Sequence, residues 1–443
     1  MKEMNRPTIK IMCFVSLIAV TVFALQTQAF HTQQSKYNNE KKAWVNLNMA
    51  PISASVPLTP PDRAEDENDN HNDASTHISF LQLTREISTA RNLNLDGVLN
   101  ARDLATCKHS PIQRGKVFRT GKLSGATSKD ITLLMETLQL KTLVDLRSPT
   151  ELKEDEKLMR SDVFGNFTNV VWKDRGRTKD GCVRVLQQDE FPIKDKFWKR
   201  SKKHPQTLID DMLVGKEELP PPDDCQECDN LGGLLASHLV YQGQRKERLF
   251  VPLMSEFKYV KGTLSKLRKR DIVRAVLKSP GSLFSKRVRN SIKKPFLKEI
   301  NDGGLQMLNE LLFRYGAPGI KFVLETCADE NRHPVAFYCT AGKDRTGAIA
   351  AIILALCKVD LDDIVEDYSL SAHVYADMND NEAMVGALSQ RSLDPEIFLG
   401  APPSVMNDTL LTIRDQFGSV EEYCSWIGFG PEKQQQLRKA LLK

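Results

Sequence analysis

Short apolar runs alternate along the chain with segments whose apolar residues recur at helical spacing. Three β-prone runs predict strands at Thr142–Asp145, Asn169–Trp172 and Val335–Tyr338. Helical spacing predicts helices over Ile131–Leu138 and Leu305–Phe313. The run Thr346–Cys357 is apolar but too rich in alanine for a strand, so it predicts a buried helix. A strand, a glycine-bearing loop and a buried helix in succession are typical of open α/β sheets, whose ligands bind outside the carboxyl ends of the strands.

The N-terminal apolar run, Ile11–Leu25, has the features of a targeting signal. Basic residues precede it, and the small residues Thr27 and Ala29 stand at positions suited to cleavage before Phe30. The run is about 15 residues long, shorter than the ~20 that a membrane-spanning helix needs. We therefore predict a secretory signal peptide over residues 1–29, which makes the protein secreted or lumenal. The alternative is an uncleaved anchor.

Residues 30–76 have the composition of a segment that does not fold by itself. They begin basic, rich in hydroxyls and poor in acids, and then become proline-rich and acidic. Such a segment buries too little apolar surface to offset the entropy of ordering, so we expect a disordered linker. A basic stretch after a signal peptide also resembles the transit part of the two-part presequences of algae with secondary plastids. In a protein from such an alga, the destination would be the plastid.

The overall composition restricts the class of protein. The chain has 443 residues, of which 41% are hydrophobic and 27% charged. These values fit a soluble globular protein and exclude a polytopic membrane protein, a collagen and a wholly disordered chain. Nine cysteines are too sparse for a small disulfide-stapled domain. Cys225 and Cys228 stand in a polar, proline-flanked loop, where zinc, a disulfide and no special role all stay open.

The net charge of +5 conceals a strong local bias. Residues 258–298 contain 14 basic residues and a single acid, Asp271, so this segment carries +13 and the rest of the chain −8. This balance makes no case for nucleic acid as a partner. Apolar residues at helical spacing predict helices here. The segment is either a basic surface that attracts phosphorylated substrates or an anionic membrane, or a solvated face that balances the acidic remainder.

The loop between the strand Val335–Tyr338 and the buried helix carries the chemistry. It contains Cys339 and, six residues later, Arg345. A cysteine at a helix N-terminus feels the positive end of the helix dipole, which favours the thiolate. The N–H groups of such a loop bind a tetrahedral anion, and a guanidinium matches two phosphate oxygens. Thr346 can place a hydroxyl near the sulfur. The residues expected to hold phosphate are Thr340, Ala341, Gly342, Lys343, Asp344 and Arg345.

The Cys-x5-Arg-Thr-Gly pattern of this loop resembles the active site of the cysteine-dependent protein tyrosine phosphatase superfamily. The order of further motifs is similar to the bacterial tyrosine phosphatase family typified by the secreted mycobacterial phosphatase B, which also acts on phosphoinositides. These motifs are Asn100–Leu104, Gly115–Thr120, Val144–Ser148 with Glu151, Asp363–Ser369 and Glu421–Tyr423. The match covers about residues 95–175 and 300–443. It implies a three-layer αβα phosphatase fold over residues 77–443, with a central, mostly parallel sheet and a largely helical insertion at about 176–299.

The resemblance also implies a general acid, which must come from outside the nucleophile to protonate the leaving group. Asp174 stands where relatives carry an acid-bearing loop and is the first candidate, and Asp344 inside the phosphate loop is the rival. Many relatives have histidine before the nucleophile, whereas this chain has Tyr338. Stabilisation of the thiolate then depends more on the helix dipole and Arg345.

Other matched residues are expected to have supporting roles. Lys343 would add a charge for a second phosphate, as in lipid phosphatases with Gly-Lys in this loop. Arg119, Asp145 and Arg147 are expected to be mainly structural, and Arg147 can pair with Glu151, four residues further on.

Together these features predict a metal-independent phosphatase that needs no cofactor. Cys339 would attack phosphorus to form a phosphocysteine, which water then hydrolyses, while Arg345 and the loop N–H groups hold the phosphate oxygens. The expected substrates are phosphotyrosine proteins, with dual specificity included. The alternatives are phosphoinositides and a non-catalytic module that only binds phosphate.

Overall fold

The computed structural model describes residues 72–174, 182–185, 246–254, 256–282, 286–372, 398 and 400–442. The described residues fall into two compact units, one within 68–259 and 303–443 and the other within 260–302. The predicted signal peptide, most of the predicted linker, and Cys225 and Cys228 lie outside the described residues. No helix in the described ranges has both the length and the apolar character needed to cross a membrane.

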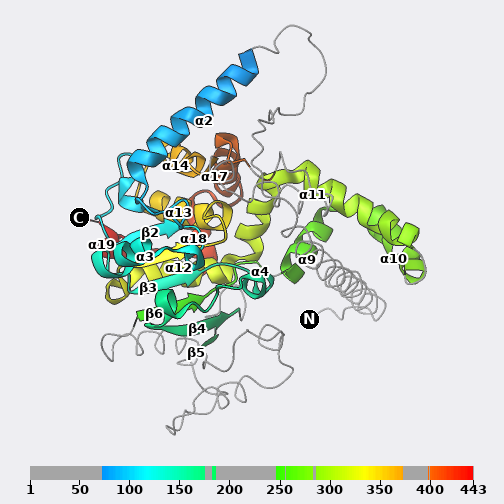
Figure 1. Ribbon diagram of the computed structural model, residues 1–443. Helices are drawn as coiled ribbons and strands as arrows, with labels where there is room; N and C mark the ends of the chain where they lie inside the picture. Colours follow the sequence, from blue (N-terminus) through cyan, green and yellow to red (C-terminus); the bar gives the residue numbers. More distant parts are fainter. Residues whose placement is uncertain are drawn as a thin grey trace, which may run out of the picture. The chain divides into compact units, whose positions relative to one another are not determined.

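The larger unit is built on a seven-stranded sheet in the order β1-β2-β7-β3-β6-β4-β5 (Figure 1). The five central strands run parallel, and each edge strand pairs antiparallel with its neighbour. The three strands predicted from the sequence are β3, β4 and β7, and an α/β fold with a mostly parallel central sheet is confirmed. The strands are β1 (Arg102–Asp103), β2 (Val117–Thr120), β3 (Thr142–Asp145), β4 (Phe167–Lys173), β5 (Cys182–Val185), β6 (Lys246–Phe250) and β7 (Val335–Tyr338).

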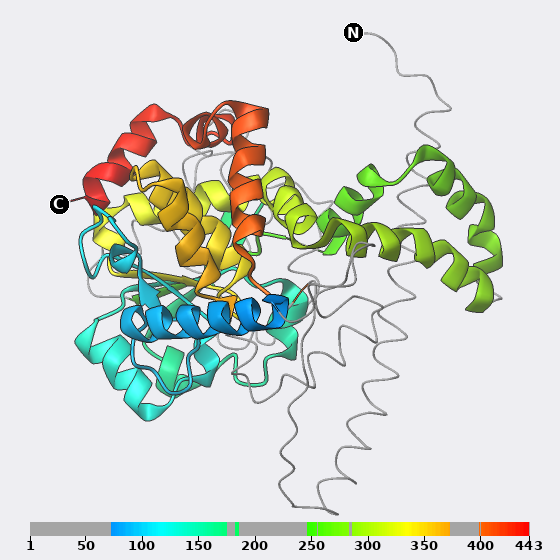
Figure 2. The same cartoon turned by 90° about the horizontal axis from the view of Figure 1, so that it is seen from above.

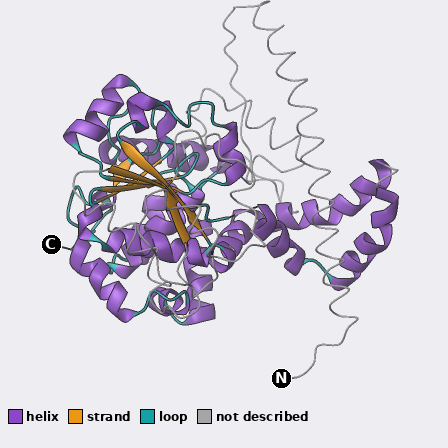
Figure 3. Cartoon of the chain, turned by 90° about the horizontal axis from the view of Figure 1, so that it is seen from below, coloured by secondary structure: helices purple, strands orange, loops and turns teal. Residues whose placement is uncertain are grey.

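Helices cover both faces of this sheet (Figures 2 and 3). Both faces of the sheet are apolar and need covering. In strand β7, for example, successive side chains alternate between two hydrophobic cores. Val335 and Phe337 belong to the larger core, whereas Ala336 and Tyr338 belong to the smaller one on the other face. The larger core packs against α12 (Ala317–Ala328), α13 (Asp344–Leu356), α17 (Pro403–Phe417), α18 (Val420–Trp426) and α19 (Pro431–Leu441). The smaller core packs against α3 (Ser128–Ile131), η3 (Thr132–Thr137) and α5 (Ser161–Phe164).

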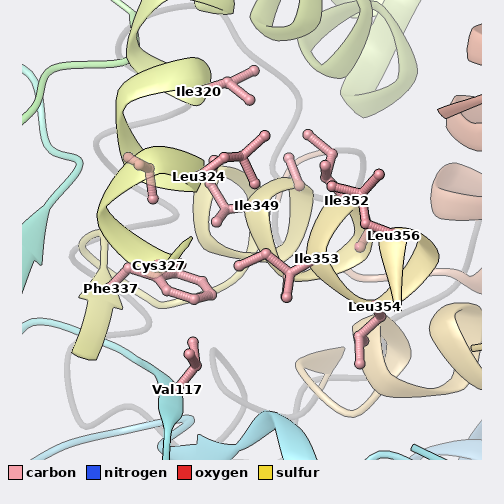
Figure 4. Close-up of a cluster of buried hydrophobic side chains, with 14 of the residues drawn as sticks. Val117, Ile320, Leu324, Cys327, Phe337, Ile349, Ile352, Ile353, Leu354 and Leu356 are labelled. Carbon is pink, nitrogen blue, oxygen red and sulfur yellow. The ribbon is translucent and has the colours of Figure 1, made fainter. Parts of the chain in front are cut away.

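The predicted buried helix is α13, which lies against the sheet in the larger core. Ile349 and Ile353 of α13, Leu324 of α12 and Phe337 of β7 gather in one apolar cluster (Figure 4). Each of these side chains is fully buried, which stabilises the fold by about 1.5–3 kcal/mol per residue relative to exposure. This packing holds the first turn of α13 at the end of β7, where the Cys339 loop joins them.

The remaining helices connect these layers. The predicted helix at Ile131–Leu138 is formed by α3 and η3, and the one at Leu305–Phe313 lies within α11. The other helical segments are α2 (Asn72–Arg91), η1 (Leu104–Thr106), η2 (Leu123–Gly125), α4 (Pro149–Glu154), α9 (Glu256–Lys266), α10 (Lys269–Ser282), α11 (Lys286–Tyr315), η6 (Glu330–Arg332) and α14 (Leu361–Ser369).

The interval 176–299, predicted as a largely helical insertion, also contributes the strands β5 and β6 to the sheet. Strand β6 lies between β3 and β4 in the middle of the sheet, and β5 from the same interval forms an edge. The pattern hid β6 because it begins with three charged residues. Two of them, Glu247 and Arg248, are buried and paired: Glu247 with Arg332 at 2.9 Å, and Arg248 with Asp145 at 3.2 Å. Charges neutralised inside the fold do not produce an apolar pattern.

The basic segment 258–298 is helical, as its spacing predicted, and is formed by α9, α10 and the first half of α11. Gly304 has φ 50° and ψ −150°, outside the helical region, so α11 consists of two helices that meet at this glycine. The break falls at the junction of the two units. The helix α2 begins at Asn72, so the last residues of the predicted disordered linker are helical instead. The polar residues Asn72 and Asp73 suit a helix N-terminus.

Candidate active site

The loop from Cys339 to Lys343 links β7 to α13. Cys339 follows the strand directly and is only 3% exposed. Gly342 has φ +71°, and a Cβ atom there would lie 2.6 Å from the carbonyl group of Thr120, so the backbone path requires glycine. No side chain caps the N-terminus of α13. The first N–H groups of the helix are therefore not satisfied by a capping residue and face the loop.

Three carbonyl groups of this loop accept hydrogen bonds from the surrounding protein. The amide Nδ2 of Asn100 donates to the oxygens of Gly342 (2.8 Å) and Ala341 (3.3 Å). Nη2 of Arg119 also donates to Gly342 (2.8 Å), and the N–H of Lys122 donates to Thr340 (3.1 Å). In a trans peptide the C=O and the next N–H point in opposite directions. The N–H groups that follow these carbonyls are thus turned toward the inside of the loop.

Arg345 is held by Glu151. Its Nη1 donates to Oε2 of Glu151 at 2.5 Å and its Nη2 to Oε1 at 2.6 Å. The Oε1 atom also accepts from the Thr340 hydroxyl at 2.6 Å. Arg345 thus uses its two terminal nitrogens on Glu151, and within the described residues its Nε donates to no acceptor. The side edge of the guanidinium is available to an anion in the loop.

Glu151 takes this position because of its own helix terminus. Ser148 and Glu151 form a capping box at the start of α4, in which Ser148 N–H and Oγ–H both donate to Oε2 of Glu151 (2.9 and 2.8 Å). Burial alone would raise the pKa of Glu151, but the charge and hydrogen bonds of Arg345, with those of Thr340 and Ser148, hold it well below its usual range. Glu151 is therefore ionised at neutral pH and orients Arg345 as a carboxylate.

The predicted pairing of Arg147 with Glu151 is wrong. The guanidinium of Arg147 instead binds Asp145 at 2.8 and 2.7 Å and Asp155 at 2.7 Å. Asp145 and Arg147 are both buried at the end of β3, so each charge is neutralised by the other in the interior of the protein. The Ser-x-x-Glu signature of the capping box, Ser148 to Glu151, was the sequence signal for where Glu151 turns.

A buried cluster of charges supports the loop from the other side. Asp367 of α14 accepts hydrogen bonds from Arg102 (2.9 Å), Arg119 (2.6 Å) and Arg91 (2.9 Å). Burial would raise the pKa of Asp367, but these arginines hold it far below its usual range. The pKa of Arg102 is lowered to about 10 by burial and by Arg119. Arg119 therefore connects the Asp367 carboxylate directly to the carbonyl of Gly342.

Lys343 does not occupy the place predicted for a second phosphate. Its side chain is fully buried, and Nζ donates to the carbonyls of Phe398 (2.8 Å) and Gly400 (2.6 Å) and lies 3.7 Å from Asp344. Burial lowers the pKa of Lys343, and the neighbouring Asp344 and Cys339 oppose this. The ammonium thus holds Phe398 and Gly400 beside the loop through their carbonyl groups.

Thr346 and Tyr338 lie beside the loop and differ in whether their hydroxyl groups are hydrogen-bonded. Oγ1 of Thr346 is buried and has no hydrogen-bond partner among the described residues, Cys339 included. A buried hydroxyl left in this state costs about 1–3 kcal/mol. Tyr338, which precedes Cys339, is buried in the opposite core and accepts a hydrogen bond from Arg248 (3.0 Å). Its side chain therefore points away from the loop.

The structure separates the two candidate acids. Asp344 is the first residue of α13, beside Arg345, and its Oδ1 accepts from the Tyr368 hydroxyl at 3.3 Å. Asp174 follows β4, is partly exposed, and forms an ion pair with Lys258. Two strands, β6 and β3, lie between β4 and β7, which places their ends about 14 Å apart. The apolar pattern predicted no strand between β3 and β4, whereas β6 lies between them in the sheet.

No three His, Cys, Asp or Glu side chains of the described residues gather in a way that could hold a metal ion.

The functional residues missed from the sequence are those that hold the loop from outside. Asn100 and Asp367 lie in matched motifs, but no spacing rule connects either residue with the Cys339 loop. Asn100 is more than 200 residues away from the loop along the chain. Only the fold shows that they converge.

The geometry defines a class of protein: a parallel α/β sheet with an anion-binding loop that carries a cysteine and an arginine between a strand and a helix. The chain belongs to the tyrosine phosphatase family, because the model of that family matches residues 93–212 and 280–443. A tyrosine-protein phosphatase of Nostoc commune is 32% identical over 137 residues, which make up 29% of this chain and 45% of the relative. The chain therefore matches less than half of the length of this relative. The likeness to the mycobacterial type stays a prediction.

Proposed function

We propose that this protein is a tyrosine phosphatase that works through a phosphocysteine. The geometry of the Cys339 loop is the observation that supports this proposal. Cys339 lies in a backbone cradle whose carbonyls are bound by Asn100, Arg119 and Lys122, so that N–H groups face inward. Arg345 presents its side edge to the same place while Glu151 holds its end. A thiol inside such an anion site is suited to attack phosphorus rather than only to bind phosphate.

The proposed reaction has two steps. The Cys339 thiolate forms a sulfur–phosphorus bond as the bond from phosphorus to the tyrosine oxygen breaks, and an acid donates a proton to that oxygen. Water then attacks phosphorus, the sulfur leaves as thiolate, and inorganic phosphate is released. In both steps the phosphate oxygens are held by the loop N–H groups and by Arg345. The hydroxyl of Thr346, which has no hydrogen-bond partner among the described residues, is available to the sulfur when it leaves.

The position of the acids favours Asp344 over Asp174 as the proton donor. The Asp344→Asn variant should hydrolyse phenyl phosphate about 10²-fold more slowly than wild type, but para-nitrophenyl phosphate much less slowly, since nitrophenolate leaves without a proton. Asp174→Asn is the matched comparison and should affect both esters equally. Steady-state kcat for both esters and both variants checks this. The reverse pattern would transfer the acid role to Asp174.

The role of Glu151 gives a second prediction. Glu151→Gln keeps the shape of the side chain and part of the capping box but removes the charge opposite Arg345. Hydrogen bonds to charged groups contribute about 1.5–3 kcal/mol, so kcat/KM should fall about 10–100-fold. The inhibition constant for vanadate should rise in parallel, since a loosened Arg345 binds oxyanions less well. Glu154→Gln, on the exposed side of α4, is the control. Equal kcat/KM in wild type and Glu151→Gln would contradict the positioning role.

The substrate class follows from the family and from Lys343. Membership of the tyrosine phosphatase family favours phosphotyrosine proteins. Phosphoinositides were expected from the resemblance to the mycobacterial type and from Lys343 reaching a second phosphate. The ammonium of Lys343 is fully buried against backbone carbonyls instead, which removes the second of these reasons. Dual specificity stays a secondary proposal. A panel of phosphotyrosine, phosphoserine and phosphothreonine peptides, with phosphoinositides in vesicles, ranks these classes by kcat/KM.

A direct assay tests the proposal against a module that only binds phosphate. The chain should hydrolyse para-nitrophenyl phosphate in the presence of a chelator, and vanadate should inhibit this activity. Binding of vanadate without any hydrolysis of the panel would support the binding module and overturn the phosphatase.

A further inference from the structure

The helix α10 exposes large apolar side chains to an unusual degree. Val273 is 54% exposed and Leu277 74% exposed. Only five large hydrophobic side chains of the described residues are exposed, and these two are one helical turn apart. Leu277 is the most exposed of the five. The helix α10 belongs to the smaller unit.

The same side of α10 carries positive charge. At about 100° per residue, Arg270, Val273, Arg274 and Leu277 fall within an arc of about 100°, and all four are exposed. We call these four residues the α10 face. Ile272 and Ala275 lie on the other side of the helix and are half-buried. Within 258–298 the single acid, Asp271, is at the flank, 3.8 Å from Arg270 and 3.7 Å from Arg274.

The charges around the face have the same sign. Further basic side chains of this unit are exposed, and their charge is not balanced by acids within the segment. They are Lys261, Lys266, Arg268, Lys294 and Lys298. Lys298 pairs with Asp302 just beyond the segment. A face that mixes exposed aliphatic side chains with guanidinium groups suits neither bulk water nor a protein core.

We propose that the α10 face docks on an anionic membrane surface. At such an interface Val273 and Leu277 enter the boundary of the acyl chains, while Arg270 and Arg274 bind lipid phosphates. The complementarity of charge carries the choice of partner: residues 258–298 have a formal charge of +13, and a negatively charged leaflet attracts such a segment. If the test fails, the alternative occupant of the α10 face is an acidic protein.

The first experiment measures binding of the full chain to vesicles of phosphatidylcholine with 30% phosphatidylserine by co-sedimentation. The double variant Val273→Ser/Leu277→Ser should bind about 10-fold more weakly. Arg270→Gln/Arg274→Gln should lose about 10–30-fold and show a weaker dependence on salt. Leu83→Ser on α2 removes a side chain that is 54% exposed, as Val273 is, and should not change binding. Circular dichroism verifies that the variants keep their helices.

A second measurement assigns the contact to α10 rather than to another apolar part of the chain. The Leu277→Trp variant should gain fluorescence quenching by brominated acyl chains in anionic vesicles, relative to wild type, and none in vesicles of phosphatidylcholine alone. Absence of this extra quenching overturns the proposal whatever co-sedimentation shows, since the α10 face then stays out of the lipid and is left to a protein partner. Equal losses for Leu83→Ser and the α10 variants overturn it as well. Neither result depends on phosphatase activity.

Discussion

Cys339→Ser is expected to abolish turnover while the chain still binds phosphate analogues. A serine hydroxyl at this position is not ionised at neutral pH, so the attacking anion is lost, whereas the N–H groups and Arg345 that hold the oxygens are unchanged. Loss of a covalent nucleophile costs several orders of magnitude in other hydrolases, so we expect kcat to fall at least about 10⁴-fold. Binding of a phosphopeptide should be retained, because the groups that hold its phosphate oxygens remain in place.

The control for this variant is another buried cysteine. Cys357 follows α13 directly, at the opposite end from Cys339, and burial raises its pKa to about 12. Cys357→Ala should therefore keep most of the activity, although it removes a thiol from the same core. Calorimetric titration with a phosphopeptide, together with a turnover assay, separates binding from chemistry. Turnover by Cys339→Ser above about 1% of wild type would show that another group attacks phosphorus.

Asp367→Asn is expected to cause the largest loss of stability. It leaves Arg102 and Arg119, both fully buried, without their carboxylate. Breaking a buried ion pair by removing one partner costs about 3–5 kcal/mol. Glu366→Gln is the matched control from the adjacent residue: Glu366 also binds Arg91, but its side chain is 35% exposed, so the loss should be below about 1 kcal/mol. Unfolding by urea at pH 7 measures both.

The same variant should change how stability depends on pH. The folded pKa of Asp367 lies below its unfolded value, near 3.9, because three arginines surround the carboxylate. The group therefore adds stability above about pH 4, and this contribution disappears as the pH falls through the folded pKa. The free energy of unfolding of the wild type should fall more steeply below about pH 4 than that of Asp367→Asn. Parallel curves would show that folding does not change the pKa of Asp367.

The parts of the fold that repeat a simple pattern could be predicted from the sequence. Strand β7 is apolar throughout and helix α13 is apolar after its first turn, and both lie close to where the pattern placed them. Strand β6 was missed because Glu247 and Arg248 are buried charges, which no period of apolar residues reveals. Its presence moves Asp174 one strand further from the loop than the linear order suggests.

The members of the loop could be read from one motif, but the directions of their side chains could not. Lys343 was expected to face the ligand because it is charged, yet two carbonyls near Gly400 satisfy it inside the protein. Glu151 was assigned to Arg147 because the two are four residues apart, yet the capping box turns it toward Arg345. Sequence spacing gives neighbours on a helix, whereas these contacts depend on which carbonyl or carboxylate the tertiary fold brings nearest.

The hydrogen bond from Nζ of Lys258 to the carbonyl of Tyr315, at 2.8 Å, has a consequence for how the chain tolerates length. It joins the start of α9 to the end of α11, so the stretch between residues 258 and 315 begins and ends at neighbouring points of the larger unit. With the two ends already together, adding or removing residues changes the closure entropy only slowly, by about 0.6 kcal/mol for each doubling of length. The interval 260–302 can therefore lengthen, shorten or take on a new surface while the sheet and the Cys339 loop stay as they are.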